Sequence, residues 1–119
     1  MGPLISKPHR ERVTGYVSAG ERDGATLVLD GRTAAVPDLP HGHWFGPTVF
    51  EDVNPDMSIG RDEIFGPVLA TIRFSDVDDA VKKGNDSLYG LAAAVWTRDV
   101  SKAHRVARAL KAGTVWINS

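Results

Sequence analysis

Residues 68–118 read VLATIRFSDVDDAVKKGNDSLYGLAAAVWTRDVSKAHRVARALKAGTVWIN, and this stretch decides the fold. It holds three short apolar segments, at 68–74, 91–97 and 114–118, which are typical of buried strands. The first intervening segment opens with an S-x-x-acid helix start at 75–78, and the second has a cap at Asp99 or Ser101. Strand, helix, strand, helix, strand predicts an α/β fold: a mostly parallel sheet with covering helices and right-handed crossovers.

The first part of the chain predicts one long helix followed by short extended pieces. Ser6 can cap a helix whose inner positions are Val13, Tyr16 and Val17, at i, i+3, i+4 spacing. Residues 25–29 indicate a strand, 32–46 a loop rich in Pro and Gly, and 48–50 a short extended segment. Residues 57–67 are expected to be irregular.

The composition limits the classes of protein to which this chain can belong. The chain has 119 residues, a net charge of −1 and 42% hydrophobic residues, which indicates a single globular domain and no basic surface for nucleic acid. The longest apolar run, residues 91–96, is too short to span a bilayer, and the start lacks the pattern of a signal peptide, so a cytoplasmic location is expected. With no cysteine, the chain holds no disulfide and no thiol nucleophile.

One segment combines residue types suited to a nucleotide. Glu63 and Phe65 stand two residues apart, directly before a Gly-Pro turn that leads into a predicted strand. An ionised carboxylate can accept both hydrogen bonds of a ribose diol, and an aromatic ring offers a flat surface to a heterocycle. From the chemistry alone, a solvated Glu and a Phe in the core are the simpler interpretation.

Four stretches carry a resemblance to a known family: GPTVFEDVNPDM (46–57), DEIFGPVLATIRF (62–74), NDSLYGLAAAVWTRDVSKAHRVARAL (85–110) and AGTVWIN (112–118). Their order and spacing resemble the aldehyde dehydrogenase superfamily, and residues 1–17 match less strictly. The resemblance implies that residues 1–119 are part of the catalytic domain of an NAD- or NADP-dependent aldehyde dehydrogenase. Because the last predicted strand runs to the final residues, the chain is expected to be an internal piece of a longer protein.

The resemblance also implies roles for individual residues. In this family, the Glu of the E-I-F-G-P motif binds the hydroxyls of the nicotinamide ribose, which corresponds to Glu63. The Phe of the motif packs near the nicotinamide ring, which corresponds to Phe65. Polar side chains of the first helix reach the same ribose region in some members, and these correspond to His9 and Arg12. Asn118 matches an Asn near the aldehyde channel, and its role is expected to be structural.

The family's chemistry needs parts that this chain does not hold. A cysteine thiolate attacks the aldehyde, hydride passes to the nicotinamide, and a separate Glu activates the water that hydrolyses the thioester. The resemblance places those residues upstream of Met1, so the chain alone is expected to be inactive, with no metal site, while the parent takes an aldehyde and forms a homo-oligomer. Two alternatives stay open: a non-catalytic truncated module that folds and self-associates, or the stable remainder of a proteolysed enzyme.

Overall fold

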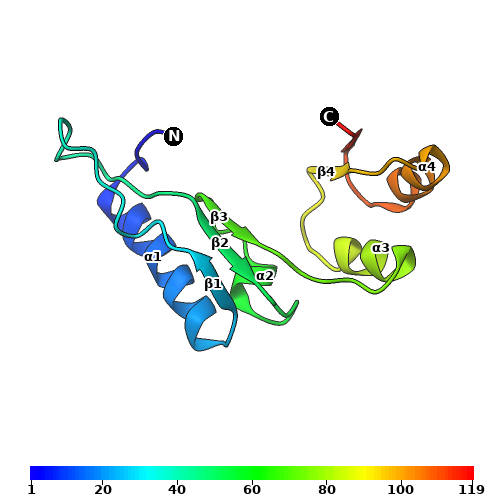
Figure 1. The fold of residues 1–119 in the computed structure, drawn as a ribbon, viewed down its shortest axis with the longest axis horizontal. Coiled ribbons are helices and arrows are strands. Elements are labelled where there is room, and N and C mark those ends of the chain that lie inside the picture. Colours follow the sequence, from blue (N-terminus) through cyan, green and yellow to red (C-terminus); the bar gives the residue numbers. More distant parts are fainter. The chain divides into compact units, whose positions relative to one another are not determined.

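A computed structural model describes residues 1–119, which divide into two compact units, residues 1–73 and 74–119. Each unit has its own helices and its own sheet (Figure 1). That all 119 residues belong to one catalytic domain stays a prediction.

The first unit begins with its longest helix, α1 (Lys7–Arg22). The Ser6 hydroxyl accepts a hydrogen bond from the backbone N–H of His9, which confirms the expected cap, and the proline near the start occupies the first turn, where no N–H is needed. Val13, Val17 and Gly20 form the buried stripe of the helix. Helix formation here follows from local signals, a cap and a repeating apolar face.

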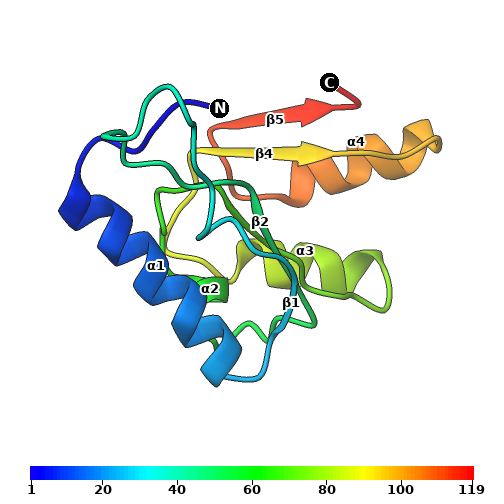
Figure 2. The ribbon, with the colours of Figure 1, turned by 60° about the vertical axis from the view of Figure 1, so that its left-hand side comes forward.

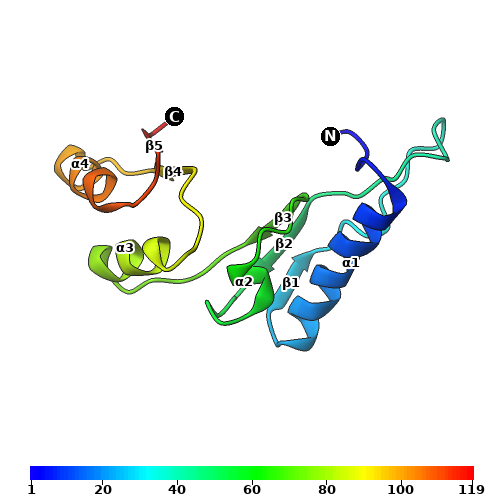
Figure 3. The same ribbon diagram turned by 180° about the vertical axis from the view of Figure 1, so that it is seen from behind.

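The sheet of the first unit has the order β1-β2-β3, with β1 (Thr26–Leu29) antiparallel to β2 (Thr48–Glu51), and β2 parallel to β3 (Val68–Ala70). A short helix, α2 (Ser58–Arg61), interrupts the segment that was expected to be irregular, so that prediction was wrong at residues 58–61. Helix α1 lies along the sheet and contacts α2, which Figure 3 shows from behind. Two helices and three strands thus enclose one small core.

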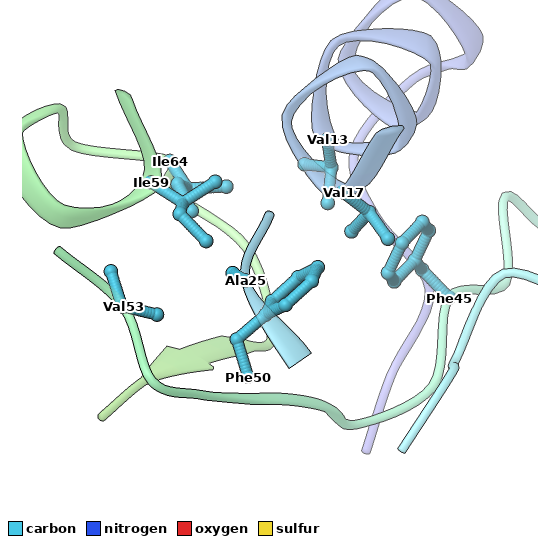
Figure 4. Close-up of a cluster of buried hydrophobic side chains, with 8 residues drawn as sticks. All are labelled: Val13, Val17, Ala25, Phe45, Phe50, Val53, Ile59 and Ile64. Atoms are coloured by element: carbon cyan, nitrogen blue, oxygen red, sulfur yellow. The ribbon is translucent and has the colours of Figure 1, made fainter. Parts of the chain in front are cut away.

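That core consists of eight buried side chains contributed by the helices, the strands and the connecting loops. Phe50 on β2 lies at its centre and is 0% exposed. Figure 4 shows the cluster, made of Val13, Val17, Ala25, Phe45, Phe50, Val53, Ile59 and Ile64. Burial of such side chains is the main favourable contribution to folding, so the position of α1 against loop 62–67 depends on this cluster.

The second unit is a parallel strand-helix-strand motif preceded by one helix. It comprises α3 (Val77–Asn85), β4 (Ala92–Val95), α4 (Val100–Ala109) and β5 (Thr114–Ile117), and β4 pairs with β5 in parallel. Helix α4 packs against both strands (Figure 2). The α/β class with parallel strand pairs and covering helices is confirmed, although β3 bonds to β2 and not to β4.

The caps of these two helices refine the expectation from sequence. Helix α3 is capped by Asp76, whose carboxylate accepts from the N–H of Asp79, so the expected cap at Ser75 was one residue too early. The carboxylate of Asp79 in turn accepts from the N–H of Ser75, which gives a reciprocal arrangement. Helix α4 is capped by Asp99 and not by Ser101.

The prediction that the apolar strands are buried on both faces was wrong for these 119 residues. Leu69 on β3 is 57% exposed, and Trp96, directly after β4, is 71% exposed. Strand β3 is also shorter than the expected 68–74. The physical reason is that helices cover only part of these strands' surface, and a side chain that alternates to the other face meets solvent.

None of the helices is long and apolar enough to cross a membrane.

Candidate functional site

Loop 62–67 of the first unit presents Glu63 and Phe65 on its outer side. The side chain of Ile64 points into the core and is buried. The next inward position is Gly66, where an added Cβ would lie only 2.8 Å from Cγ2 of Val13. Ile64 and Gly66 thus face inward, with Gly66 close to Val13 of α1, and the residues that alternate with them, Glu63 and Phe65, face outward.

Phe65 has an unusual backbone conformation and an exposed ring. Its φ of 57° lies in the left-handed region, which a bulky residue rarely adopts and which carries a cost of about 1–3 kcal/mol. Its side chain is 73% exposed, so the core prediction that chemistry alone favoured was wrong. Strained residues of this kind cluster at ligand sites, and here the strain turns an aromatic ring towards solvent.

The polar side of α1 binds the backbone of this loop. Nε2 of His9 donates to the carbonyl oxygen of Phe65 at 2.7 Å, and the two rings meet edge to face with centroids 6.2 Å apart. The guanidinium of Arg12 donates to the carbonyl oxygen of Glu63 at 3.2 Å. The structure thus brings together all four residues that the family resemblance singled out.

A fifth and a sixth residue belong to the same arrangement and were not predicted as site residues. The hydroxyl of Tyr16 donates to Oδ2 of Asp62 at 3.1 Å, and the Arg12 guanidinium lies 5.7 Å from the centre of the Tyr16 ring. The expected inner position of Tyr16 is confirmed for its ring, which packs against the core, while its hydroxyl lies at the surface. The spacing of residues 9, 12 and 16, which is i, i+3, i+7 on a helix, was the available signal.

The carboxylate of Glu63 itself makes no hydrogen bond or ion pair with the rest of the chain, and the residue is exposed. Its only restraints are those on the backbone on either side. The site therefore offers a free carboxylate and an exposed ring two residues apart on a loop whose backbone is fixed. Such a pair can accept hydrogen bonds from a diol and pack against a flat ring, which fits the ribose and base of a nucleotide.

Helix α1 is also bound firmly on the side away from this loop. Nε of Arg10 donates to the carbonyl oxygen of Trp44 at 2.8 Å, and Nη2 of the same guanidinium donates to the carbonyl oxygen of Arg32 at 3.0 Å. Arg32 pairs with Glu21 at 2.6 Å and with Asp30 at 2.7 Å, and its guanidinium lowers the pKa of the Asp30 carboxyl. These bonds hold α1 against the loop at 30–46, so the helix is a stable support for residues 62–67.

Asn118 lies in the second unit and closes the end of the β4–β5 pair. Its side-chain oxygen accepts from the N–H of Thr97, and its amide donates to the carbonyl of Thr97, both at 2.9 Å. Its φ is 53°, a conformation that Asn tolerates better than most residues. Both polar atoms of the side chain are thus engaged in holding the strands, in agreement with the expected structural role.

These features describe an α/β segment with an exposed carboxylate and an exposed aromatic ring on one loop, and comparison with known proteins gives its family. The sequence model of the aldehyde dehydrogenase family matches residues 1–119. The chain belongs to the aldehyde dehydrogenase family.

Two kinds of relative show how much of the family's architecture is present. A betaine aldehyde dehydrogenase of Brucella anthropi is 44% identical over the whole chain, which covers 24% of that protein. Among solved structures, a betaine aldehyde dehydrogenase of Staphylococcus aureus in complex with NAD+ matches with a TM-score of 0.94 at 43% identity, over 100% of this chain and 24% of that one. A Mycobacterium tuberculosis aldehyde dehydrogenase complexed with NAD+ matches 99% of this chain and 24% of its own, at 46% identity and a TM-score of 0.92. The chain therefore spans about a quarter of the length of these relatives.

Proposed function

We propose that Glu63 and Phe65 form the nicotinamide-ribose end of a dinucleotide site in a longer enzyme that oxidises an aldehyde to a carboxylic acid. In this role the Glu63 carboxylate accepts hydrogen bonds from the ribose hydroxyls, and the Phe65 ring packs beside the nicotinamide. His9 and Arg12 border the same surface. The observation that carries the proposal is the outward presentation of a free carboxylate and an exposed aromatic ring on a loop with a fixed, strained backbone.

The dinucleotide is NAD+ or NADP+, and the relatives solved with NAD+ favour the first. When bound, the nicotinamide supplies the acceptor for hydride from the substrate. The residues of this chain hold the ribose and limit the orientation of the ring. We expect the particular aldehyde to be selected largely by residues outside these 119 positions.

The test uses the longer protein that contains this sequence, with Glu63→Gln. An amide has one acceptor oxygen instead of two and carries no charge, so it binds a diol more weakly. The variant is expected to lower the single-turnover rate of NADH formation by about tenfold, because a hydrogen bond to a charged group contributes about 1.5–3 kcal/mol. Alkylation of the catalytic cysteine by iodoacetamide is expected to proceed at the parent's rate.

A matched control is Glu51→Gln, which changes an exposed carboxylate at the end of β2, outside loop 62–67. It is expected to leave the rate of NADH formation unchanged. An unaltered rate in Glu63→Gln at every cofactor and substrate concentration would show that the role proposed for Glu63 is wrong.

For the 119-residue chain by itself we propose a second description, a folded module without catalysis that associates with copies of itself. The absence of cysteine supports the first part, and the exposure of Leu88, Leu91 and Trp96 in the second unit supports the second. Sedimentation velocity is expected to show a mass above 12.8 kDa that rises with concentration. A monomer at every concentration contradicts self-association, and NADH formation by the pure chain contradicts inactivity.

We also propose that the longer protein is a cytoplasmic homo-oligomer. Cell fractionation together with light scattering tests both statements.

A further inference from the structure

We infer that Tyr16 is a positioning residue: its hydroxyl, through Asp62, orients Glu63 for the ribose. This inference rests on the proposed role of Glu63 and adds a residue to it. Tyr16 lies on α1, 46 residues before Asp62, so the pair joins two segments that only the fold brings together.

The argument begins with how Glu63 is held. Its carboxylate has no partner within the chain, so its direction depends on the backbone that carries it. Asp62, the preceding residue, directly follows α2 and is fixed at two points: its N–H donates to the carbonyl of Ser58 at 2.9 Å, and its carboxylate accepts from Tyr16 at 3.1 Å. The backbone between Asp62 and the buried Ile64 is therefore restrained on both sides of Glu63.

The effect of Tyr16 can be measured separately from the effects of His9 and Arg12, the other two residues of α1 that bond to this loop. His9 and Arg12 bind backbone carbonyls of the loop and are also expected beside the ribose. A substitution at either residue would therefore change both the position of the loop and the direct contact with the ribose. The Tyr16 hydroxyl bonds to a side chain that carries no proposed contact with the cofactor. Its ring also lies beneath the Arg12 guanidinium, a contact that phenylalanine keeps.

The hydrogen bond lies at the surface, where it contributes little to global stability. Its loss is expected to appear in the placement of the ribose and not in the unfolding temperature. Loss of one hydrogen bond from a neutral donor to a carboxylate is expected to change the equilibrium constant between two loop orientations by about threefold to tenfold. A similar reduction is expected in the rate of the hydride-transfer step.

The experiment compares four forms of the longer protein: parent, Tyr16→Phe, Glu63→Ala and the double variant. The readouts are the single-turnover rate of NADH formation with saturating NAD+ and the Kd of NAD+, measured by calorimetry in the absence of aldehyde. Tyr16→Phe alone is expected to lower the rate by about threefold to tenfold. In the Glu63→Ala background the same change is expected to have no further effect, because the hydroxyl acts through Glu63.

Two further variants exclude a general effect of a lost hydrogen bond. Thr14→Val removes a 2.8 Å bond from the Thr14 hydroxyl to the carbonyl of Arg10 on the same helix, away from the loop, and is expected to leave the rate unchanged. Asp62→Asn keeps an acceptor oxygen for Tyr16 and is expected to retain more activity than Asp62→Ala.

The outcomes separate this inference from the proposed function. If Glu63→Ala has the parent's rate, the proposed function fails and this inference fails with it. If Glu63→Ala is slow but Tyr16→Phe has the parent's rate, or slows the Glu63→Ala variant by the same factor as the parent, the proposed function stands and the role of Tyr16 is refuted.

Discussion

Replacing Gly66 by alanine tests the close packing that presents the site. The added Cβ would lie 2.8 Å from Cγ2 and 3.0 Å from Cγ1 of Val13, whereas carbon atoms prefer a separation of about 3.5–4.0 Å. Val13 is fully buried, and valine in a helix has one strongly preferred rotamer, so its methyl groups cannot turn away. The loop must move instead, and Phe65 and Glu63 move with it.

Two effects of opposite sign determine the size of the change. Overpacking in a core costs about 1–3 kcal/mol. Replacement of glycine by alanine restricts the unfolded chain and stabilises the protein by about 0.4–1 kcal/mol. Gly66→Ala is therefore expected to lower the free energy of unfolding by at most about 2.6 kcal/mol, which is measured by urea unfolding with far-UV circular dichroism.

The same helix provides a control of opposite sign. A Cβ on Gly15 of α1 would meet nothing within 4 Å, so Gly15→Ala is expected to stabilise the protein by about 0.5–1 kcal/mol. The clash also predicts a compensating variant. Val13→Ala removes the methyl groups in question, so the double variant Val13→Ala/Gly66→Ala is expected to lose at least about 0.5 kcal/mol less than the sum of the single changes. A stability gain in Gly66→Ala equal to that of Gly15→Ala, or strict additivity with Val13→Ala, would refute the reasoning.

Two further predictions concern the second unit. Asp79 accepts hydrogen bonds from Lys83 and from the N–H of Ser75, and these bonds lower the pKa of its carboxyl below the ordinary value of 3.8. The ionised carboxylate therefore stabilises the folded protein above pH 3.8, and this contribution is lost as the pH falls through the folded-state pKa. Thermal unfolding between pH 2 and pH 6 is expected to show a smaller acid-dependent fall in Asp79→Asn than in the parent, and an identical fall would contradict this assignment. The second prediction concerns the cap of α4. Asp99→Ala loses the 2.9 Å bond from the N–H of Lys102 and is expected to lower the free energy of unfolding by about 1 kcal/mol in urea, whereas Asp99→Asn is expected to keep most of the stability. An Asp99→Ala variant as stable as the parent would argue against the cap.

Much of the secondary structure could be predicted because its causes are local. Ser6 and Asp99 cap their helices through bonds to backbone groups three residues away, and the apolar spacing of Val13 and Val17 defines the face that α1 buries. The short helix α2 was missed because four residues without a side-chain cap carry no periodic signal. The burial of the strands was overestimated because an apolar run shows that a strand can be buried, but it does not show which neighbouring elements are present to cover it.

The candidate site was predictable only in part. Residue chemistry alone favoured a solvated Glu63 and a buried Phe65, and it was the resemblance to a family that singled out these residues with His9 and Arg12. The structure shows why chemistry was insufficient: the exposure of Phe65 depends on a backbone φ of 57° and on a carbonyl held by a histidine 56 residues away. Neither fact has a signature in the local sequence.

By itself, then, the sequence determined the α/β class, the family, the Ser6 cap of α1 and the lack of a thiol nucleophile, since each follows from residue identity or from interactions within one turn of helix. Only the tertiary structure decided how the loop at 62–67 is presented. The close approach of Gly66 to Val13 and the bond from Tyr16 to Asp62 join residues 46 to 53 positions apart. Such contacts form when burial of the core places α1 against the loop, and no local preference of either segment specifies them.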